Sequence, residues 1–98
     1  MAKEVAMLKY LPNGWIQHFT SISSDDVLLF KIGRFAVFQP INETIIILLD
    51  KTLNITYCFD TRVLETREDY NKVIHCLKLC LKKYYQKQNG KQLSLFSN

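Results

Sequence analysis

The sequence predicts an α+β fold: an antiparallel sheet of four to five strands, one long C-terminal helix packed on one face of that sheet, and then a flexible tail. Three observations support this prediction. Short segments rich in β-branched and aromatic residues follow one another as far as Asp60, and turns rather than helices separate them. One apolar stripe with helical spacing begins at Tyr70. Beyond it the chain becomes polar and contains Gly90.

Length and composition indicate a single domain. The 98 residues are too few for two independent cores, and 48% of them are hydrophobic, which suffices for one core. We expect residues 1–88 to form this domain and residues 89–98 to form the tail. The longest aliphatic run, Ile45–Leu49, is too short to cross a bilayer, and the N-terminal residues lack a signal-peptide pattern. The sequence therefore predicts a cytoplasmic protein.

The predicted sheet begins near a turn signal. The dipeptide Asn13-Gly14 favours a tight turn between two apolar stretches, Val5–Leu11 and Trp15–Ile22. We interpret Trp15–Ile22 as a strand and expect a shorter strand in the stretch before the turn. The polar run Ser23–Asp26 then interrupts the pattern.

The next stretch, Val27–Phe38, admits two interpretations. It is either a strand bent at Gly33, or a short helix that Ser24 caps and Gly33 ends, followed by a strand at Arg34–Gln39. The aromatic and β-branched residues of the second half favour a strand there. The first half is left open between helix and strand.

Two further strands follow, each bounded by a turn. Pro40–Glu43 is a turn, and Thr44–Leu49 has the β-branched density of a buried central strand. Asp50–Asn54 forms the next turn. In Ile55–Asp60 the residues alternate between two faces. We expect Ile55, Tyr57 and Phe59 to point inward, and Thr56 and Cys58 to lie on the other face.

The helix is the clearest element of the sequence. Thr66 is a suitable N-cap, and acidic residues occupy the first turn after it. We expect the helix to end near Gln86–Gln88, because Asn89-Gly90 is a natural stop. Its apolar stripe consists of Tyr70, Val73, Ile74, Leu77, Leu81 and Tyr84.

The cysteines do not form a recognisable metal site. Zinc requires about four nitrogen or sulfur ligands, usually in closely spaced pairs. Cys76 and Cys80 are one helical turn apart, but the neighbouring His75 points about 100° away from Cys76. We interpret these two thiols and Cys58 as buried and unreactive in a reducing cytoplasm, and we expect neither a metal nor a cofactor.

The sequence gives no catalytic motif. Its two histidines, His18 and His75, lack a recognisable partner for acid–base or nucleophilic chemistry, so we expect a protein that is not an enzyme. The remaining enzymatic alternative is a metal-dependent nuclease, which needs converging carboxylates. The first carboxylates to test for that activity are Asp26, Asp50 and Asp60.

Charge is distributed unevenly along the chain. Residues 1–70 carry seven Lys and Arg against nine Asp and Glu, whereas residues 71–98 carry six Lys and no acid. This asymmetry is typical of a solubilising helix face and also of a surface that binds an anionic partner. If the Lys-rich helix binds DNA, the contact should be weak, salt-sensitive and independent of base sequence. The candidate nucleic-acid contacts are Lys78, Lys82, Lys83, Tyr85 and Lys87.

The tail carries the most specific motif, Gln92-Leu93-Ser94-Leu95-Phe96. This pentapeptide resembles the one by which many bacterial replication and repair proteins dock on the replicative sliding clamp, the β subunit of DNA polymerase III. The usual form is Gln-Leu-(Ser or Asp)-Leu-Phe, which the tail matches at every position. A chance match has a probability on the order of 10⁻⁶ per position. The resemblance covers five residues and implies nothing about the folded body.

The resemblance implies a role for each residue of the motif. Leu95 and Phe96 would fill the main hydrophobic pocket of the clamp, and Gln92 would fix the register through its amide. Leu93 would pack on an adjoining shallow site, and Ser94 would tolerate change. The alternative is that the motif is an edge strand of the sheet. Phe96 argues against one buried face, because it falls out of phase with the two leucines.

The sequence thus predicts a small non-enzymatic accessory protein of bacterial, phage or plasmid origin. We expect it to dock on the sliding clamp through the tail, in DNA replication, repair or the biology of mobile elements. The alternative is a small DNA-binding or regulatory module that acts through the Lys-rich helix. A homodimer is possible in either case, through an apolar sheet edge.

Overall fold

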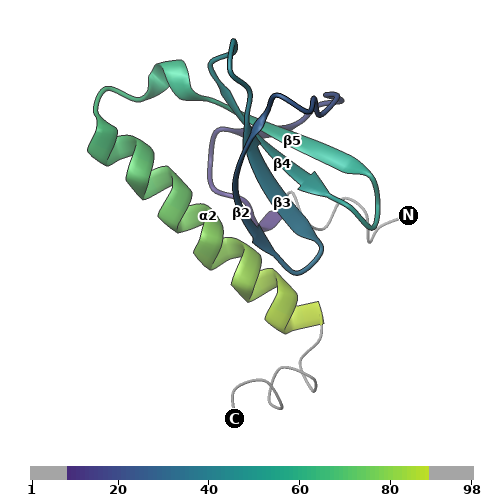
Figure 1. Cartoon of the computed structure of the whole chain (residues 1–98). Helices are drawn as coiled ribbons and strands as arrows, with labels where there is room; N and C mark the ends of the chain where they lie inside the picture. The colour runs from purple at the N-terminus through teal and green to yellow at the C-terminus, as the bar shows by residue number, and fades with distance from the viewer. Residues whose placement is uncertain (1–8, 89–98) are drawn as a thin grey trace.

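A computed structural model describes residues 9–88 of the chain and confirms the α+β class (Figure 1). Five strands form one sheet, and one long helix packs on it. The elements are β1 Trp15–Gln17, β2 Val27–Ile32, β3 Phe35–Gln39, β4 Ile45–Asp50, β5 Ile55–Asp60, the 3-10 helix η1 Thr61–Val63 and the helix α2 Arg67–Gln88.

The sheet is antiparallel throughout, with strand order β1-β5-β4-β3-β2. Strands β2 to β5 form a meander, since each pairs with the next strand along the chain. β1 pairs with β5, so that β1 and β2 are the two edges of the sheet. The expected antiparallel sheet of four to five strands is therefore confirmed with five, of which four form the meander.

The strand predicted at Trp15–Ile22 is much shorter than expected, and β1 ends at Gln17. The reason is topological. β1 and β2 lie on opposite edges, so the segment between them must cross the sheet. It does so on the face away from α2, where the backbone N–H of His18 donates to the Thr56 carbonyl (3.1 Å) and that of Thr20 to Thr56 Oγ1 (3.1 Å).

The turn at Asn13-Gly14 is confirmed. Gly14 has φ +102°, and a Cβ there would lie 2.7 Å from the ring of Phe59, so both backbone and space require glycine. The shorter strand expected within Val5–Leu11 lies mostly outside the described residues. Its residues Lys9 and Tyr10 have helical backbone, so the strand does not extend to them.

The ambiguous stretch Val27–Phe38 is a β-hairpin and contains no helix. Ile32 pairs with Phe35, and Gly33 is the first of the two loop residues between them. Its φ of +57° suits a type II′ hairpin turn, which favours glycine at this position. The strand interpretation of the first half is thus confirmed, but the chain reverses at Gly33 instead of bending.

Helix α2 has the start and the apolar stripe that the sequence predicts. The Thr66 hydroxyl accepts a hydrogen bond from the backbone N–H of Asp69 (3.0 Å), which satisfies one free donor of the first turn. Leu77 and Leu81 are fully buried against the sheet. The core cluster is Trp15, Phe35, Val37, Ile46, Leu48, Tyr57, Phe59, Leu77, Leu81 and Tyr84.

The face of the sheet away from α2 is also apolar. Ala36 and Ile47 are fully buried there, partly under the segment that joins β1 to β2. Toward the edges the cover is incomplete, and Ile16 and Leu28 are 57% and 48% exposed. None of the helical segments between residues 9 and 88 has the length and apolar character that a membrane crossing requires.

Candidate functional site

The clamp-like motif, Gln92–Phe96, lies outside the described residues. α2 ends at Gln88, and the last member of the core cluster on this helix is Tyr84. The motif therefore begins four residues beyond the helix and eight beyond the last described core contact. None of the described core contacts depends on it.

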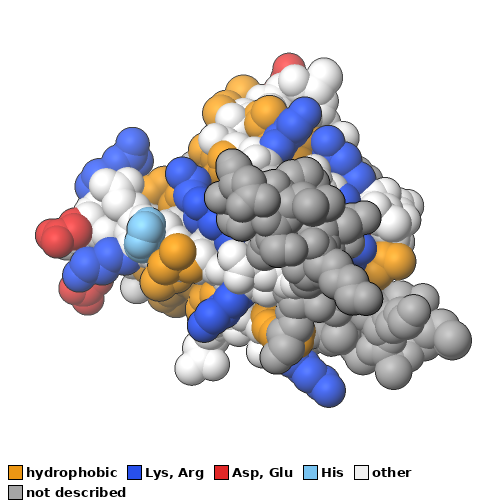
Figure 2. All heavy atoms as spheres, turned by 90° about the horizontal axis from the view of Figure 1, so that it is seen from below, with side chains coloured by type: hydrophobic (Ala, Val, Ile, Leu, Met, Phe, Trp, Pro, Cys, Tyr) orange, Lys and Arg blue, Asp and Glu red, His pale blue; other side chains and the backbone are white. Residues whose placement is uncertain are grey.

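The lysines proposed for nucleic-acid contact lie on α2 but do not share one face. Lys78 and Lys82 are one turn apart on the flank near β2, whereas Lys83 is rotated about 140° from Lys78. Lys82 and Lys83 are exposed, and Lys78 is half-buried. The backbone of Tyr85 and Lys87 continues α2, but their side chains lie outside what the structure describes. Figure 2 shows Lys and Arg side chains spread around this end of the molecule, with apolar and polar groups between them.

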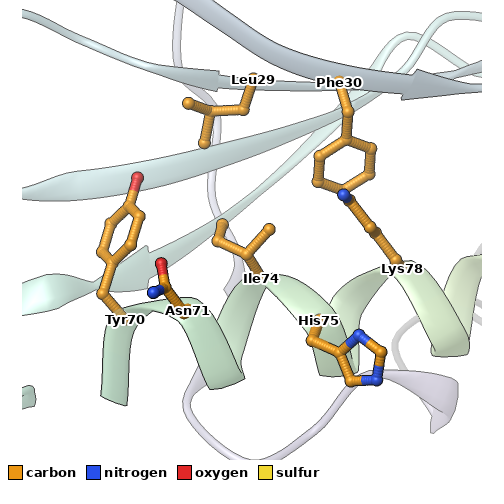
Figure 3. A pocket seen from close by; sticks show the side chains of 7 residues that line it. All are labelled: Leu29, Phe30, Tyr70, Asn71, Ile74, His75 and Lys78. Atoms are coloured by element: carbon orange, nitrogen blue, oxygen red, sulfur yellow. The ribbon is translucent and has the colours of Figure 1, made fainter. Parts of the chain in front are cut away.

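A groove of about 340 Å³ runs between α2 and the edge strand β2 (Figure 3). Its apolar surface comes from both elements. The polar side chains of Asn71, His75 and Lys78 project from the helix. The Lys78 ammonium lies 5.1 Å from the centre of the Phe30 ring, a cation–π contact across the groove. Sequence reasoning missed this groove, because it depends on which strand lies beside the helix. Its lining residues are Leu29, Phe30, Tyr70, Asn71, Ile74, His75 and Lys78.

One buried carboxylate, Asp50, is held by the turn that follows β4. Its Oδ1 accepts hydrogen bonds from the backbone N–H groups of Thr52 (3.0 Å) and Leu53 (3.2 Å). Its Oδ2 lies 3.1 Å from Nη2 of Arg34, in an ion pair. Asp50 is fully buried, so its charge is compensated by this guanidinium and by the two amides.

Arg34 ties this carboxylate to the C-terminal half of α2. Its Nη2 donates to the Tyr84 hydroxyl (3.3 Å), and its guanidinium lies over the rings of Phe35 (5.1 Å) and Tyr84 (5.6 Å). A polar cluster thus closes the core at the end of the molecule where the helix finishes. The sequence signal for it was an acid placed directly after a buried aliphatic strand.

The three carboxylates considered for nuclease chemistry have separate roles. Asp50 forms the buried ion pair described above. Asp26 accepts a hydrogen bond from the backbone N–H of Ser23 (2.9 Å). Asp60 pairs with Arg62 (2.8 Å), whose hydrogen bonds lower the pKa of this exposed carboxyl. Within the part of the chain from residue 9 to residue 88, no three His, Cys, Asp or Glu side chains gather where a metal could bind.

The interpretation of all three cysteines as buried is wrong for Cys76. Cys58 is buried on the sheet, and Cys80 is half-buried at the edge of the helix stripe. Burial, and secondarily the neighbouring Cys76, raise the pKa of the Cys80 thiol. Cys76 is exposed because it precedes the buried Leu77 and is turned about 100° from it around the helix.

The hydroxyl of Tyr57 is buried and has no hydrogen-bond partner among the described residues. Burial, then the Asp50 carboxylate, raise its pKa from 10.0 to about 12. Between these two values the unfolded chain loses the phenol proton while the folded chain keeps it, so the free energy of unfolding falls as pH rises. We expect Tyr57→Phe to make this decline shallower in urea denaturation measured from pH 9 to pH 12. Parallel curves for the two proteins would contradict this.

The chain matches no protein-family model, no curated protein and no solved structure. A functional assignment therefore has to rest on the residues themselves.

Proposed function

We propose that this protein is a small accessory protein that docks on the bacterial replicative sliding clamp through Gln92–Phe96. Its setting would be DNA replication, repair or the biology of a phage or plasmid. The observation that carries the proposal is the complete match of these five residues to the clamp-binding pentapeptide. Its position beyond the end of α2 also supports the proposal, because the described core is closed without it.

Docking would follow the physics of extended-peptide recognition. Alternate side chains of such a peptide enter pockets while its backbone is held by hydrogen bonds. Burial of Leu95 and Phe96 would contribute about 1.5–3 kcal/mol each before ordering costs. Together with the backbone hydrogen bonds and the remaining contacts of the motif, we expect affinity on the order of 10⁻⁶ M. Gln92 would fix the register of the peptide.

The alternative function is weak DNA binding by the lysines of α2. The exposure of Lys82 and Lys83 favours it. Lys83, however, is rotated about 140° from Lys78, so the three lysines give no single stripe along which a phosphate backbone could run. If all three contact phosphates, binding should weaken by roughly 40-fold between 50 and 200 mM salt.

Salt dependence separates the two functions. We would titrate the full chain with a purified bacterial sliding clamp and, separately, with duplex DNA, at 50 and 200 mM salt. The proposal expects micromolar clamp binding that changes only a few-fold with salt, since apolar side chains supply most of the contact. DNA binding in the micromolar range with steep salt dependence, and no binding to the clamp, would favour the helix instead.

A further inference from the structure

The groove beside α2 opens next to β2, an edge strand of the sheet that the described residues form. β2 pairs with β3 on one side, and none of the strands between residues 9 and 88 pairs with its other side. Such an edge presents free backbone donors and acceptors to an added strand. Added strands take their specificity from pockets that accept alternate side chains. The groove supplies such a pocket between Phe30 and Ile74 (Figure 3).

The direction of α2 determines how the chain after it meets this edge. Near the start of the helix, the Tyr70 hydroxyl donates to Gln39 Oε1, and Gln39 pairs with Val27, the first residue of β2. Near the end of the helix, Tyr84 contacts Arg34, in the turn just after β2. Helix and strand therefore run in the same direction (Figure 1). A segment that reverses after the helix would run antiparallel to β2, the orientation found in every pair of this sheet.

The chain beyond α2 is long enough to reach the groove. Asn89-Gly90 supplies two residues suited to a reversal. From Gly90 to Leu95 an extended chain spans about 17 Å. The distance along α2 from Gln88 back to Lys78 is about 15 Å. Leu95 can thus lie at the level of Lys78, which contacts Phe30 in the middle of the groove.

Both faces of the sheet at this edge can receive apolar side chains. On the helix side the groove is lined by Phe30 and Ile74, and on the far side Leu28 is 48% exposed. In a strand, Leu93 and Leu95 point to one face and Phe96 to the other. The out-of-phase phenylalanine, which argues against a strand with one buried face, is suited to an edge that is apolar on both.

From these observations we propose that Lys91–Phe96 docks along β2 as a sixth antiparallel strand. Leu95 enters the groove, and Phe96 lies beside Leu28 on the far face. Docking within one chain has an effective concentration in the millimolar range, so even weak contacts populate the docked state. Docking would also regulate the clamp-binding motif, and this part of the proposal rests on the proposed function. The docked strand hides Leu95 and Phe96, and clamp and groove compete for them.

Amide NMR spectra of the full chain test docking without any clamp present. We would compare the wild type with Leu95→Ser/Phe96→Ser, and use Ser97→Ala/Asn98→Ala as the matched control. The double serine variant should shift the amides of Leu28–Ile32 and Ile74–Lys78 and speed hydrogen exchange along β2. The control should leave both unchanged.

Two results would overturn the proposal. One is identical spectra of the body in the wild type and the serine variant, which would mean that the groove has another occupant or none. The other is a set of shifts that grows with protein concentration, which would assign the edge to a second copy of the chain. Either result leaves the proposed function standing, since clamp binding is measured separately and does not require docking.

Discussion

Replacement of Asp50 by alanine is expected to lower the free energy of unfolding by about 3–5 kcal/mol. The variant removes the acceptor of the two turn amides and leaves the partly buried guanidinium of Arg34 without its counter-ion. Loss of one partner from a buried pair costs more than the pair itself contributes, because the other charge stays desolvated. Urea denaturation at pH 7, followed by circular dichroism, measures the change.

Asp50→Asn is the matched control for this prediction. An asparagine keeps a side-chain oxygen for the N–H groups of Thr52 and Leu53 but loses the charge that pairs with Arg34. We expect it to lie between the wild type and Asp50→Ala in stability. An alanine variant within about 1 kcal/mol of the wild type would contradict the account of the polar cluster, because that is the range of an ordinary surface change.

Leu95→Ala/Phe96→Ala is expected to weaken clamp binding by at least about 100-fold. The two side chains would contribute about 3 kcal/mol or more in total, and each 1.4 kcal/mol corresponds to a factor of ten. Both residues lie beyond the described core, so the variant should still fold cooperatively, losing at most the small stabilisation that the proposed docked strand contributes. Binding is measured by calorimetry with a purified bacterial clamp, and stability by thermal denaturation.

Ser94→Ala is the control within the motif. The usual pentapeptide accepts either serine or aspartate at this position, so the substitution should change the affinity by no more than a few-fold. Equal affinity of the wild type and the double alanine variant would show that the body, and not the motif, makes the contact.

The elements that the sequence predicts well are those with local signals. The Thr66 cap and the apolar stripe from Tyr70 to Tyr84 define α2 without knowledge of the rest of the chain. The β-branched run at Thr44–Leu49 likewise corresponds to β4, displaced by one residue at each end. In both elements the apolar residues that the sequence pattern assigns to the core are the residues that the fold buries, fully or in part.

The errors arise where distant parts of the chain decide the structure. Trp15–Ile22 has the composition of a long strand, but its second half crosses the sheet because β2 lies on the opposite edge. Val27–Ile32 is ambiguous alone, and its pairing with β3 decides for a strand. The exposure of Cys76 follows from its position on the flank of α2, about 100° around the helix from the buried Leu77.

The candidate functional features likewise include one that the sequence reveals and others that only the fold reveals. The motif Gln92–Phe96 is visible in the sequence because the proposed recognition peptide is contiguous and its residue pattern can be read without the fold. The groove between β2 and α2 could not be predicted, since its two walls come from residues forty or more positions apart. The pair formed by Arg34 and Asp50 was missed because its members lie on different sides of the β3–β4 hairpin, and only the fold brings them together.

The measurement that tests the central claim most directly is a titration of the full chain into a purified bacterial sliding clamp, with a synthetic peptide of residues 87–98 as competitor. We predict binding on the order of 10⁻⁶ M, and displacement by the peptide at a similar or lower concentration. No binding at a hundredfold higher protein concentration would contradict the claim. Binding that the peptide fails to displace would contradict it too, because the contact would then lie on the folded body.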